Sequence, residues 1–222
     1  MLNGIPGDDP RPTGPADLVG EATPELLLCT ALVRTGRVDG CGASLMTNSH
    51  TRVPLAATDS VFKAVAEVQF SAWEGAGPDV AVSGVPILVP DVRTESRRWP
   101  LTTRRVADLP MRALAVLPMY SGSTRIGLFS AYHRQPHSHT AEDLADLLTV
   151  ARALAVLAAQ RVSGTTGTLP PTNVSTAVGM IRDRYQVSAP DAMAMLRAKA
   201  YATDSTVAAI ADDLANGGDL TW

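Results

Sequence analysis

The chain has 222 residues, of which 45% are apolar and 18% are charged, and its formal net charge is −3. This composition is typical of a globular protein with one core of about 150 residues and a small additional module. It excludes a protein that is basic throughout, and no apolar run approaches the ~20 residues of a membrane-spanning helix. We expect a cytoplasmic protein because the N-terminal residues lack the charged-then-apolar layout of a signal peptide.

The two cysteines, Cys29 and Cys41, form no CxxC pair and have no histidine at metal-ligand spacing. Cysteines of this kind in a reducing compartment behave as small apolar residues. We therefore expect both to be buried and neither to form a disulfide.

The first third of the chain predicts an arm, a helix, a hairpin and a second helix. Residues 1–17 are rich in proline and glycine without apolar periodicity, which predicts a disordered arm. Apolar spacing predicts a helix over Leu18–Arg37. Two short apolar runs, Cys41–Thr47 and Arg52–Thr58, predict a hairpin. Asp59 is expected to cap a helix over Ser60–Phe70.

The next part of the chain is richer in glycine and proline, and it predicts three strands and two helices. The expected elements are a loop over Trp73–Asp79, a strand over Pro86–Val89, a short helix over Leu101–Ala107, strands over Ala113–Tyr120 and Arg125–His133, and a helix from Thr140 to Arg161. This order predicts an α+β fold, in which helices pack on an antiparallel sheet.

Several short sequence motifs in this region occur in the order found in one known family. They are Ala56-Ala57-Thr58-Asp59, Gly77-Pro78-Asp79, Val89-Pro90-Asp91, Trp99-Pro100, Ala115–Met119 and Ile126-Gly127-Leu128. Residues 18–162 thereby resemble a GAF domain, which implies a sensor of a small molecule or another signal.

Residues 163–171 contain glycine, threonine and two prolines, which predict a linker. The remaining residues, 172–222, predict a small all-α module of three short helices. The expected helices are Asn173–Tyr185, Ala189–Ala202 capped by Ser188, and a third that is capped by Thr203-Asp204-Ser205 and ends near Asn216.

The residue pattern of this C-terminal segment is also similar to that of a known module. The run Ala177–Ile181, followed by Ser188, Asp191-Ala192, Met195–Arg197, Ala200, Asp204, Val207 and Ile210-Ala211, resembles the ANTAR domain, a three-helix RNA-binding domain of bacterial transcription antiterminators. The resemblance implies binding to hairpin loops of a nascent transcript. The candidate RNA-binding residues are Ala177, Gly179, Arg182, Arg184, Arg197 and Lys199.

The tail departs from that family in its charge. Val178, Ser205 and Thr206 stand where the family usually carries basic residues. From residue 172 onward there are four basic and six acidic side chains, a net charge of −2. Because RNA binding draws much of its free energy from phosphate contacts, a weakly acidic module begins at a disadvantage.

The expected sensor pocket has no recognisable cofactor motif. Trp73, Asp91 and Trp99 fall in loops that flank the predicted sheet and are candidate pocket residues for an unidentified small ligand. The alternative is that the tryptophans only close the core. We expect no cofactor and no enzyme, because phosphate-loop, nucleophile-elbow and zinc-hydrolase motifs are all missing from the sequence.

Two further features have alternative interpretations. His133, His137 and His139 have a spacing that metal sites use, but spacing alone fixes no geometry, so solvated loop histidines and no metal are expected. The helix after Thr140 carries enough apolar surface for a seam between two copies, or for packing within one subunit.

The sequence thus predicts a non-enzymatic antitermination regulator, in which a GAF sensor controls an ANTAR output. The expected partners are a dual-hairpin RNA and a second copy of the chain, without DNA or membrane. Two alternatives remain: an ANTAR-like protein-interaction adaptor that has lost RNA binding, and a ligand-binding GAF protein with redox activity that uses reactive cysteines.

Overall fold

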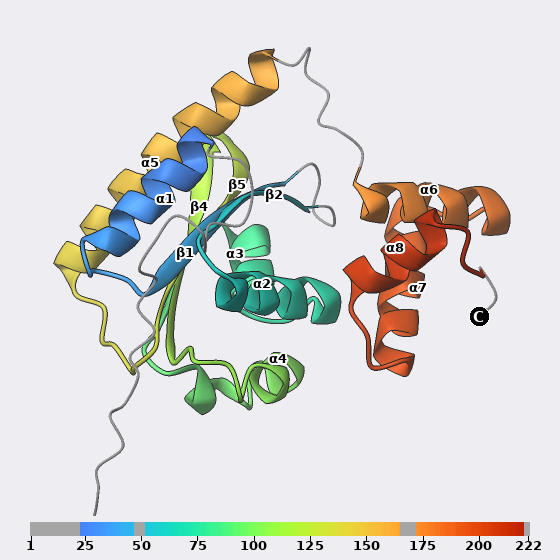
Figure 1. The fold of residues 1–222 in the computed structure, drawn as a ribbon, viewed down its shortest axis with the longest axis horizontal. Coiled ribbons are helices and arrows are strands. Elements are labelled where there is room, and N and C mark those ends of the chain that lie inside the picture. The colour runs from blue at the N-terminus through green and yellow to red at the C-terminus, as the bar shows by residue number, and fades with distance from the viewer. Residues whose placement is uncertain (1–22, 47–51, 165–171, 220–222) are drawn as a thin grey trace, which may run out of the picture.

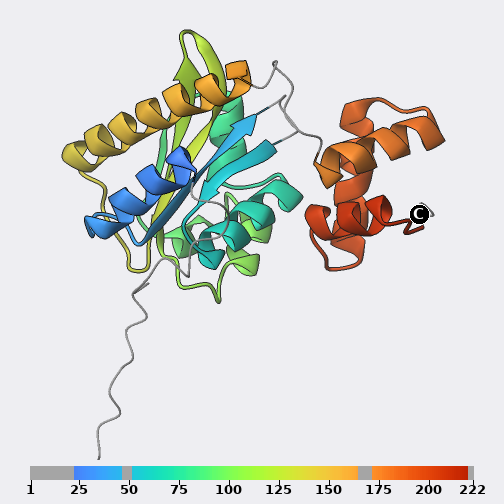
Figure 2. The same ribbon diagram turned by 45° about the horizontal axis from the view of Figure 1, so that its top comes forward.

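The computed structural model describes residues 23–46, 52–164 and 172–219, which form an α+β body and, beside it, a helical module of residues 172–219 (Figures 1 and 2). The predicted α+β class with an all-α tail is confirmed. The expected arm (1–17), the tip of the first hairpin and most of the expected linker (165–171) lie outside the described residues.

The body is built on one five-stranded sheet with the order β2-β1-β5-β4-β3, in which every neighbouring pair is antiparallel. The predicted pairing of β1 with β2 is present, the two later predicted strands form the antiparallel pair β4–β5, and the short strand β3 pairs with β4 at one edge. The strands are β1 Gly40–Met46, β2 Arg52–Ala57, β3 Ile87–Val89, β4 Ala113–Ser121 and β5 Thr124–His133.

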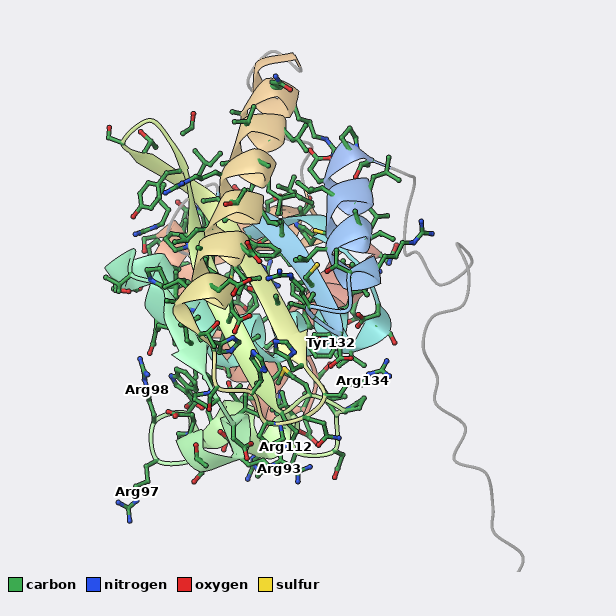
Figure 3. All side chains as sticks on the ribbon, turned by 90° about the vertical axis from the view of Figure 1, so that its left-hand side faces the viewer. Arg93, Arg97, Arg98, Arg112, Tyr132 and Arg134 are labelled. Atoms are coloured by element: carbon green, nitrogen blue, oxygen red, sulfur yellow. The ribbon has the colours of Figure 1, made fainter. Side chains whose placement is uncertain are left out.

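Helices α1 (Pro24–Arg34) and α5 (Ala141–Gly164) lie side by side on one face of the sheet (Figures 1 and 3). The core between these helices and the sheet includes Leu117, Phe129 and Leu154. Cys29 and Cys41 are free and wholly buried in the same core, as the sequence predicted. Among the described residues, no helix has both the length and the apolar character needed to cross a bilayer.

The other face carries α2 (Ser60–Ala72), α3 (Ala76–Ser83), the 3₁₀ turn η2 (Val92–Glu95) and α4 (Pro100–Arg105) (Figure 1). Asp59 caps α2 as predicted, because its Oδ1 accepts from the Phe62 N–H at 2.7 Å. Helix α2 then runs past the edge of the sheet toward the helical module.

Helix α3 corrects the expectation of a loop over residues 73–79. The glycines and Pro78 indicated a break in the chain, but proline is tolerated in a first helical turn, where backbone N–H groups have no intrahelical acceptor. Gly75 adopts φ 128°, which favours glycine, and starts the helix. The side-chain Oε1 of Gln69 accepts from the Gly77 N–H at 2.7 Å, so this first turn is satisfied from α2.

The helical module consists of α6 (Asn173–Tyr185), α7 (Ala189–Ala202) and α8 (Val207–Ala215), close to the predicted bounds. Ser188 caps α7 as predicted, whereas α8 is capped by Thr206 and not by the preceding three residues. Fully buried residues from all three helices form a separate core, among them Ala177, Ile181, Ala192, Met193, Leu196, Val207, Ala211 and Leu214.

Two glycine-to-alanine substitutions test this packing. Gly127 lies opposite Leu45 in the β1–β5 ladder, and a Cβ on it would lie 2.3 Å from the Ser44 carbonyl oxygen. Gly127→Ala should therefore destabilise the body by about 3 kcal/mol. Gly179→Ala, in an exposed part of α6 with nothing within 4 Å of the added Cβ, should stabilise by about 0.5–1 kcal/mol. Denaturant unfolding measures both, and equal effects would contradict the register.

Candidate functional site

A pocket with about 540 Å³ of space lies between α2 and the sheet. Its walls come from β1, β2, β4, β5 and α2, and include Ser44, Phe62, Ala66 and Leu128. Both its size and its largely apolar walls are those of a small-molecule site.

Arg52 brings a positive charge to the wall of this pocket. Its Nη2 donates to the Ala66 carbonyl oxygen at 3.1 Å, and its guanidinium carbon lies 5.5 Å from the centroid of the Phe70 ring. Burial lowers the pKa of Arg52, and the negative charge of Glu67 acts in the opposite direction. A polar or anionic group of a ligand could therefore be recognised at this wall.

Glu67 of α2 belongs both to the pocket and to the contact with the helical module. The residue lines the pocket, and its Oε1 accepts from the Ser71 hydroxyl at 3.1 Å and from the Ala208 backbone N–H at 3.1 Å. Ala208 is the second residue of α8. One carboxylate thus connects the pocket of the α+β body to the helical module.

The N-terminus of α8 is held by side chains of α2. The buried Val207 N–H donates to Ser71 Oγ at 2.9 Å, and the Ala208 N–H donates to Glu67. Thr206 supplies the remaining acceptor, for the Ala209 N–H at 3.1 Å. These are three of the N–H groups that a helix leaves without internal acceptors, and a carboxylate at this end also opposes the positive end of the helix dipole.

A second contact joins α4 to the turn between α7 and α8. Arg105 Nη2 lies 2.9 Å from Asp204 Oδ1, and its Nη1 donates to the Ser205 carbonyl oxygen at 3.3 Å. Asp204 is 93% exposed, so the ion pair itself contributes little. It orients the turn that leads into α8.

Arg197 of α7 lies against the end of α2, away from the position expected of an RNA contact. Its guanidinium carbon is 4.4 Å from the centroid of the Trp73 ring and 5.7 Å from that of Phe70, and its Nε donates to the Phe70 carbonyl oxygen at 3.4 Å. Burial lowers the pKa of Arg197 to about 10. In this arrangement the Arg197 side chain packs against the α+β body.

The other candidate RNA residues divide between surface and interior. Gly179, Arg182 and Arg184 are exposed on α6, and Gly179 and Arg182 line a shallow hollow. Lys199 is half-buried and donates from Nζ to the Asp219 carbonyl oxygen at 3.0 Å. Ala177 has no exposed surface, which corrects its place among the candidates: its small side chain allows close helix packing.

The candidate pocket residues Trp73, Asp91 and Trp99 do not line the pocket described above. Trp73 packs on the module, and Trp99 is buried in the core with its Nε1 donating to Asp79 Oδ2 at 3.2 Å. Asp91 is paired with Arg112, whose hydrogen bond lowers the pKa of that carboxyl. These three residues are therefore structural parts of the body.

His133, His137 and His139 do not stand separately in solvent, which corrects the expectation of solvated loop histidines. The rings of His133 and His137 are stacked with centroids 4.0 Å apart, and the ring of His139 lies 5.6 and 5.0 Å from them. Each of the three is partly buried.

Sequence reasoning missed the residues that join the two parts, Glu67, Phe70, Ser71 and Arg105. The only available signal was the spacing of Phe70 and Trp73, three residues apart at the end of a helix, which places two aromatic rings on one face. Nothing in the sequence indicated that the first N–H groups of α8 would find their acceptors on α2.

Comparison with known proteins identifies the larger part. The family model of the GAF domain matches residues 26–158, so the chain belongs to the GAF family. The match ends before α6, and the helical module lies outside it. A search of curated proteins finds no significant match.

Solved structures show the same fold. A domain assigned to a two-component sensor histidine kinase of Sinorhizobium meliloti is 21% identical, with a TM-score of 0.51 over 66% of this chain and 97% of that one. The GAF domain of an Acinetobacter phosphoenolpyruvate-protein phosphotransferase is 14% identical, with a TM-score of 0.51 over 65% of this chain and 84% of that one. These values support a GAF-like body and no particular ligand.

The contact between α2 and α8 can be tested with one serine. Ser71→Ala leaves the buried Val207 N–H without its acceptor, a loss of about 1–3 kcal/mol. Hydrogen exchange should show at least about fivefold faster exchange at Val207 and Ala208. Ser123→Ala, an exposed serine of the β4–β5 turn, is the matched control and should change neither amide. Unchanged protection in the Ser71 variant would show that α2 does not hold α8.

Proposed function

We propose that this chain is a signal-responsive transcription antitermination regulator, in which the GAF domain controls an RNA-binding helical module. The observation that carries the proposal is the double position of Glu67, in the wall of the pocket and at the N-terminus of α8. The conclusion that a GAF domain is present does not depend on it.

RNA binding by the module is supported by its resemblance to ANTAR domains and by its exposed arginines. The three helices occur in the expected order and nearly within the expected bounds. Arg182 and Arg184 lie exposed in the last turn of α6, next to the hollow beside Gly179. Guanidinium groups pair with phosphates and stack on the splayed bases of hairpin loops.

Arg197 gives this RNA surface an off state. While its guanidinium lies between Trp73 and Phe70, it cannot contact RNA. Its Nη2 is buried with no hydrogen-bond partner in the part of the chain that the structure describes, so docking leaves one strong donor unsatisfied. Release would give that donor water or phosphate and would add a cation to the surface of a module whose net charge is −2.

A ligand in the pocket would act through α2. A molecule that engages Glu67 competes with the Ala208 N–H for the same carboxylate, and a molecule that displaces Arg52 disturbs the residue that packs on Phe70. Either contact gives the ligand different affinities for the docked and released states, which is the requirement for a population shift.

The adaptor alternative draws on the same contacts. If Arg197 and the first turn of α8 always stay on α2, the exposed part of the module consists of α6, the outer side of α7 and the side of α8 that carries Asp212 and Asp213. With few basic residues there, such a surface would suit a protein partner better than RNA. The RNA measurement below separates the two proposals.

The redox alternative fits the cysteines poorly. A free methionine-R-sulfoxide reductase of Thermoplasma acidophilum is among the similar structures, at 14% identity and a TM-score of 0.42 over 61% of this chain and 89% of that one. Here both thiols are wholly buried, and neither residue lines the pocket. A hydrogen bond with Cys29, burial and nearby charges raise the pKa of Cys41 well above its usual value, which opposes formation of a reactive thiolate.

Homodimerisation remains part of the proposal. The apolar stripe of α5 is mostly used within the subunit, where Leu147, Ala151 and Leu154 are buried. Leu27 of α1 and Val156 of α5 are 55% and 58% exposed on the outer side of the helical layer, and they are the residues from which a seam with a second copy would be built.

The RNA surface can be tested with a double substitution. Arg182→Ala/Arg184→Ala should weaken binding of the full chain to a dual-hairpin RNA by about tenfold or more, because two phosphate-pairing cations are lost. Arg34→Ala/Arg152→Ala removes the same charge from exposed positions of α1 and α5, and it should leave the affinity nearly unchanged. Equal affinity of wild type and the α6 variant would reject this surface.

The off state can be tested by opening the docking contact. Ser71→Ala/Arg105→Ala removes one acceptor from α8 and the cation facing Asp204, while every candidate RNA residue is kept. We expect this variant to bind the dual-hairpin RNA more tightly than wild type, measured by fluorescence anisotropy. Affinity that stays the same or falls would show that docking does not restrain RNA binding.

A further inference from the structure

Three histidines converge where β5 leads into α5. His133 is the last residue of β5, and His137 and His139 lie in the connection to α5, whose first residue is Ala141. Figure 3 marks this end of the strand by its labels for Tyr132 and Arg134, the two neighbours of His133. One ring nitrogen from each histidine can be chosen so that all three lie within 4.8 Å of one another.

One ring of the cluster, that of His139, is buried without hydrogen bonds in the described part of the chain. Both ring nitrogens of His139 are buried and have no hydrogen-bond partner among the described residues. The backbone of Leu114 lies near this ring but does not meet hydrogen-bond geometry with either nitrogen. An imidazole buried in this way loses its water contacts without compensation unless something else binds it.

Two carboxylates lie near the cluster. Asp39 and Asp143 are close enough to His133 to act on it electrostatically. Negative charge at this place favours a bound cation.

Asp143 provides the support that metal-binding histidines commonly have. Its Oδ2 lies 3.2 Å from His137 Nε2 and accepts from the backbone N–H and the hydroxyl of Thr140 at 2.8 and 2.9 Å. Because this oxygen is already fixed by Thr140, we assign it to orienting His137, whose Nδ1 is then left for an ion. Arg37, which lines the adjacent pocket, is neutralised by ion pairs with Glu142 and Asp146.

The space beside two of the three histidines is small. A pocket with about 10 Å³ of space is lined by His133, His139 and Asp143 among other residues, which is room for about one water-sized sphere. A tetrahedral ion with nitrogen bonds of about 2.0–2.1 Å needs its ligands about 3.4 Å apart. The rings would have to close by no more than about 1.5 Å to reach that geometry.

We propose that His133, His137 and His139 bind one divalent transition-metal ion of the zinc class, with water as the fourth ligand and Asp143 as a positioning residue. Three imidazoles favour zinc, cobalt or nickel over magnesium or calcium, which prefer oxygen ligands. The ion would tie the end of β5 to the connection that leads into α5. It would thereby stabilise the helix that leads toward the output module.

The test uses the full chain, freed of any affinity tag and stripped of metal with a chelator. Co²⁺ should bind with one ion per chain and give the visible absorption bands of a tetrahedral complex, and Zn²⁺ should displace it. His139→Phe keeps a ring in the cluster but removes a ligand, and should abolish these bands. Asp143→Asn should weaken Co²⁺ binding by about 10–100-fold. His50→Ala, at the sequence's remaining histidine, should bind as wild type does.

Thermal unfolding shows whether the His139→Phe variant is folded. In chelator, His139→Phe should unfold at the wild-type temperature or above it, because two buried nitrogens without partners are removed. Zn²⁺ should then raise the unfolding temperature of wild type and leave that of the variant unchanged. Wild type without tetrahedral bands at micromolar Co²⁺, or equal binding by wild type and a folded His139→Phe, would overturn the proposal.

Discussion

The position of the helical module depends most on the acceptors that the backbone N–H groups of the first turn of α8 find. A helix begins with backbone N–H groups that have no partner within it, and those of Val207 and Ala208 find their acceptors on another part of the chain, in Ser71 and Glu67 of α2. Hydrogen bonds form only within a narrow range of distance and angle, so both are lost when the two parts separate. The position of the module therefore depends on α2.

Helix α2 is well placed for this role. One side of it forms the wall of a pocket against the sheet, and its last turn carries the aromatic rings on which Arg197 lies. The pocket-lining Glu67 and the module contacts of Phe70 and Ser71 lie within two turns of this one helix. On the proposed function, a displacement of the pocket wall would reach α8 without passing through the sheet.

Much of the fold could be predicted because its local signals are strong. Asp59 and Ser188 mark helix starts with acceptors for specific N–H groups, and period-two and period-3.6 patterns separate strands from helices. The exception, α3, was hidden because Gly75 and Pro78 usually break helices, and its first turn depends on Gln69 of a neighbouring helix. A contact of that kind has no signature in the local sequence.

The sites were less predictable, because they depend on which residues meet in space. Resemblance put Ala177 and Arg197 on an RNA surface, but helix packing buries the first and α2 takes up the second. The spacing of the three histidines left their geometry open, and the return of the chain from β5 to α5 brings their rings together. The charge count adds that this module has four basic and six acidic side chains, and its consequence for RNA binding stays a prediction.

The most direct test of the account is whether RNA binding and docking exclude each other. Spin labels on the exposed side of α4 and near the C-terminal end of α6 would report the distance between body and module by pulsed electron resonance, with and without saturating dual-hairpin RNA. The account predicts one short distance in the free protein and a longer, broader distribution in the complex. An unchanged short distance with RNA fully bound would contradict it.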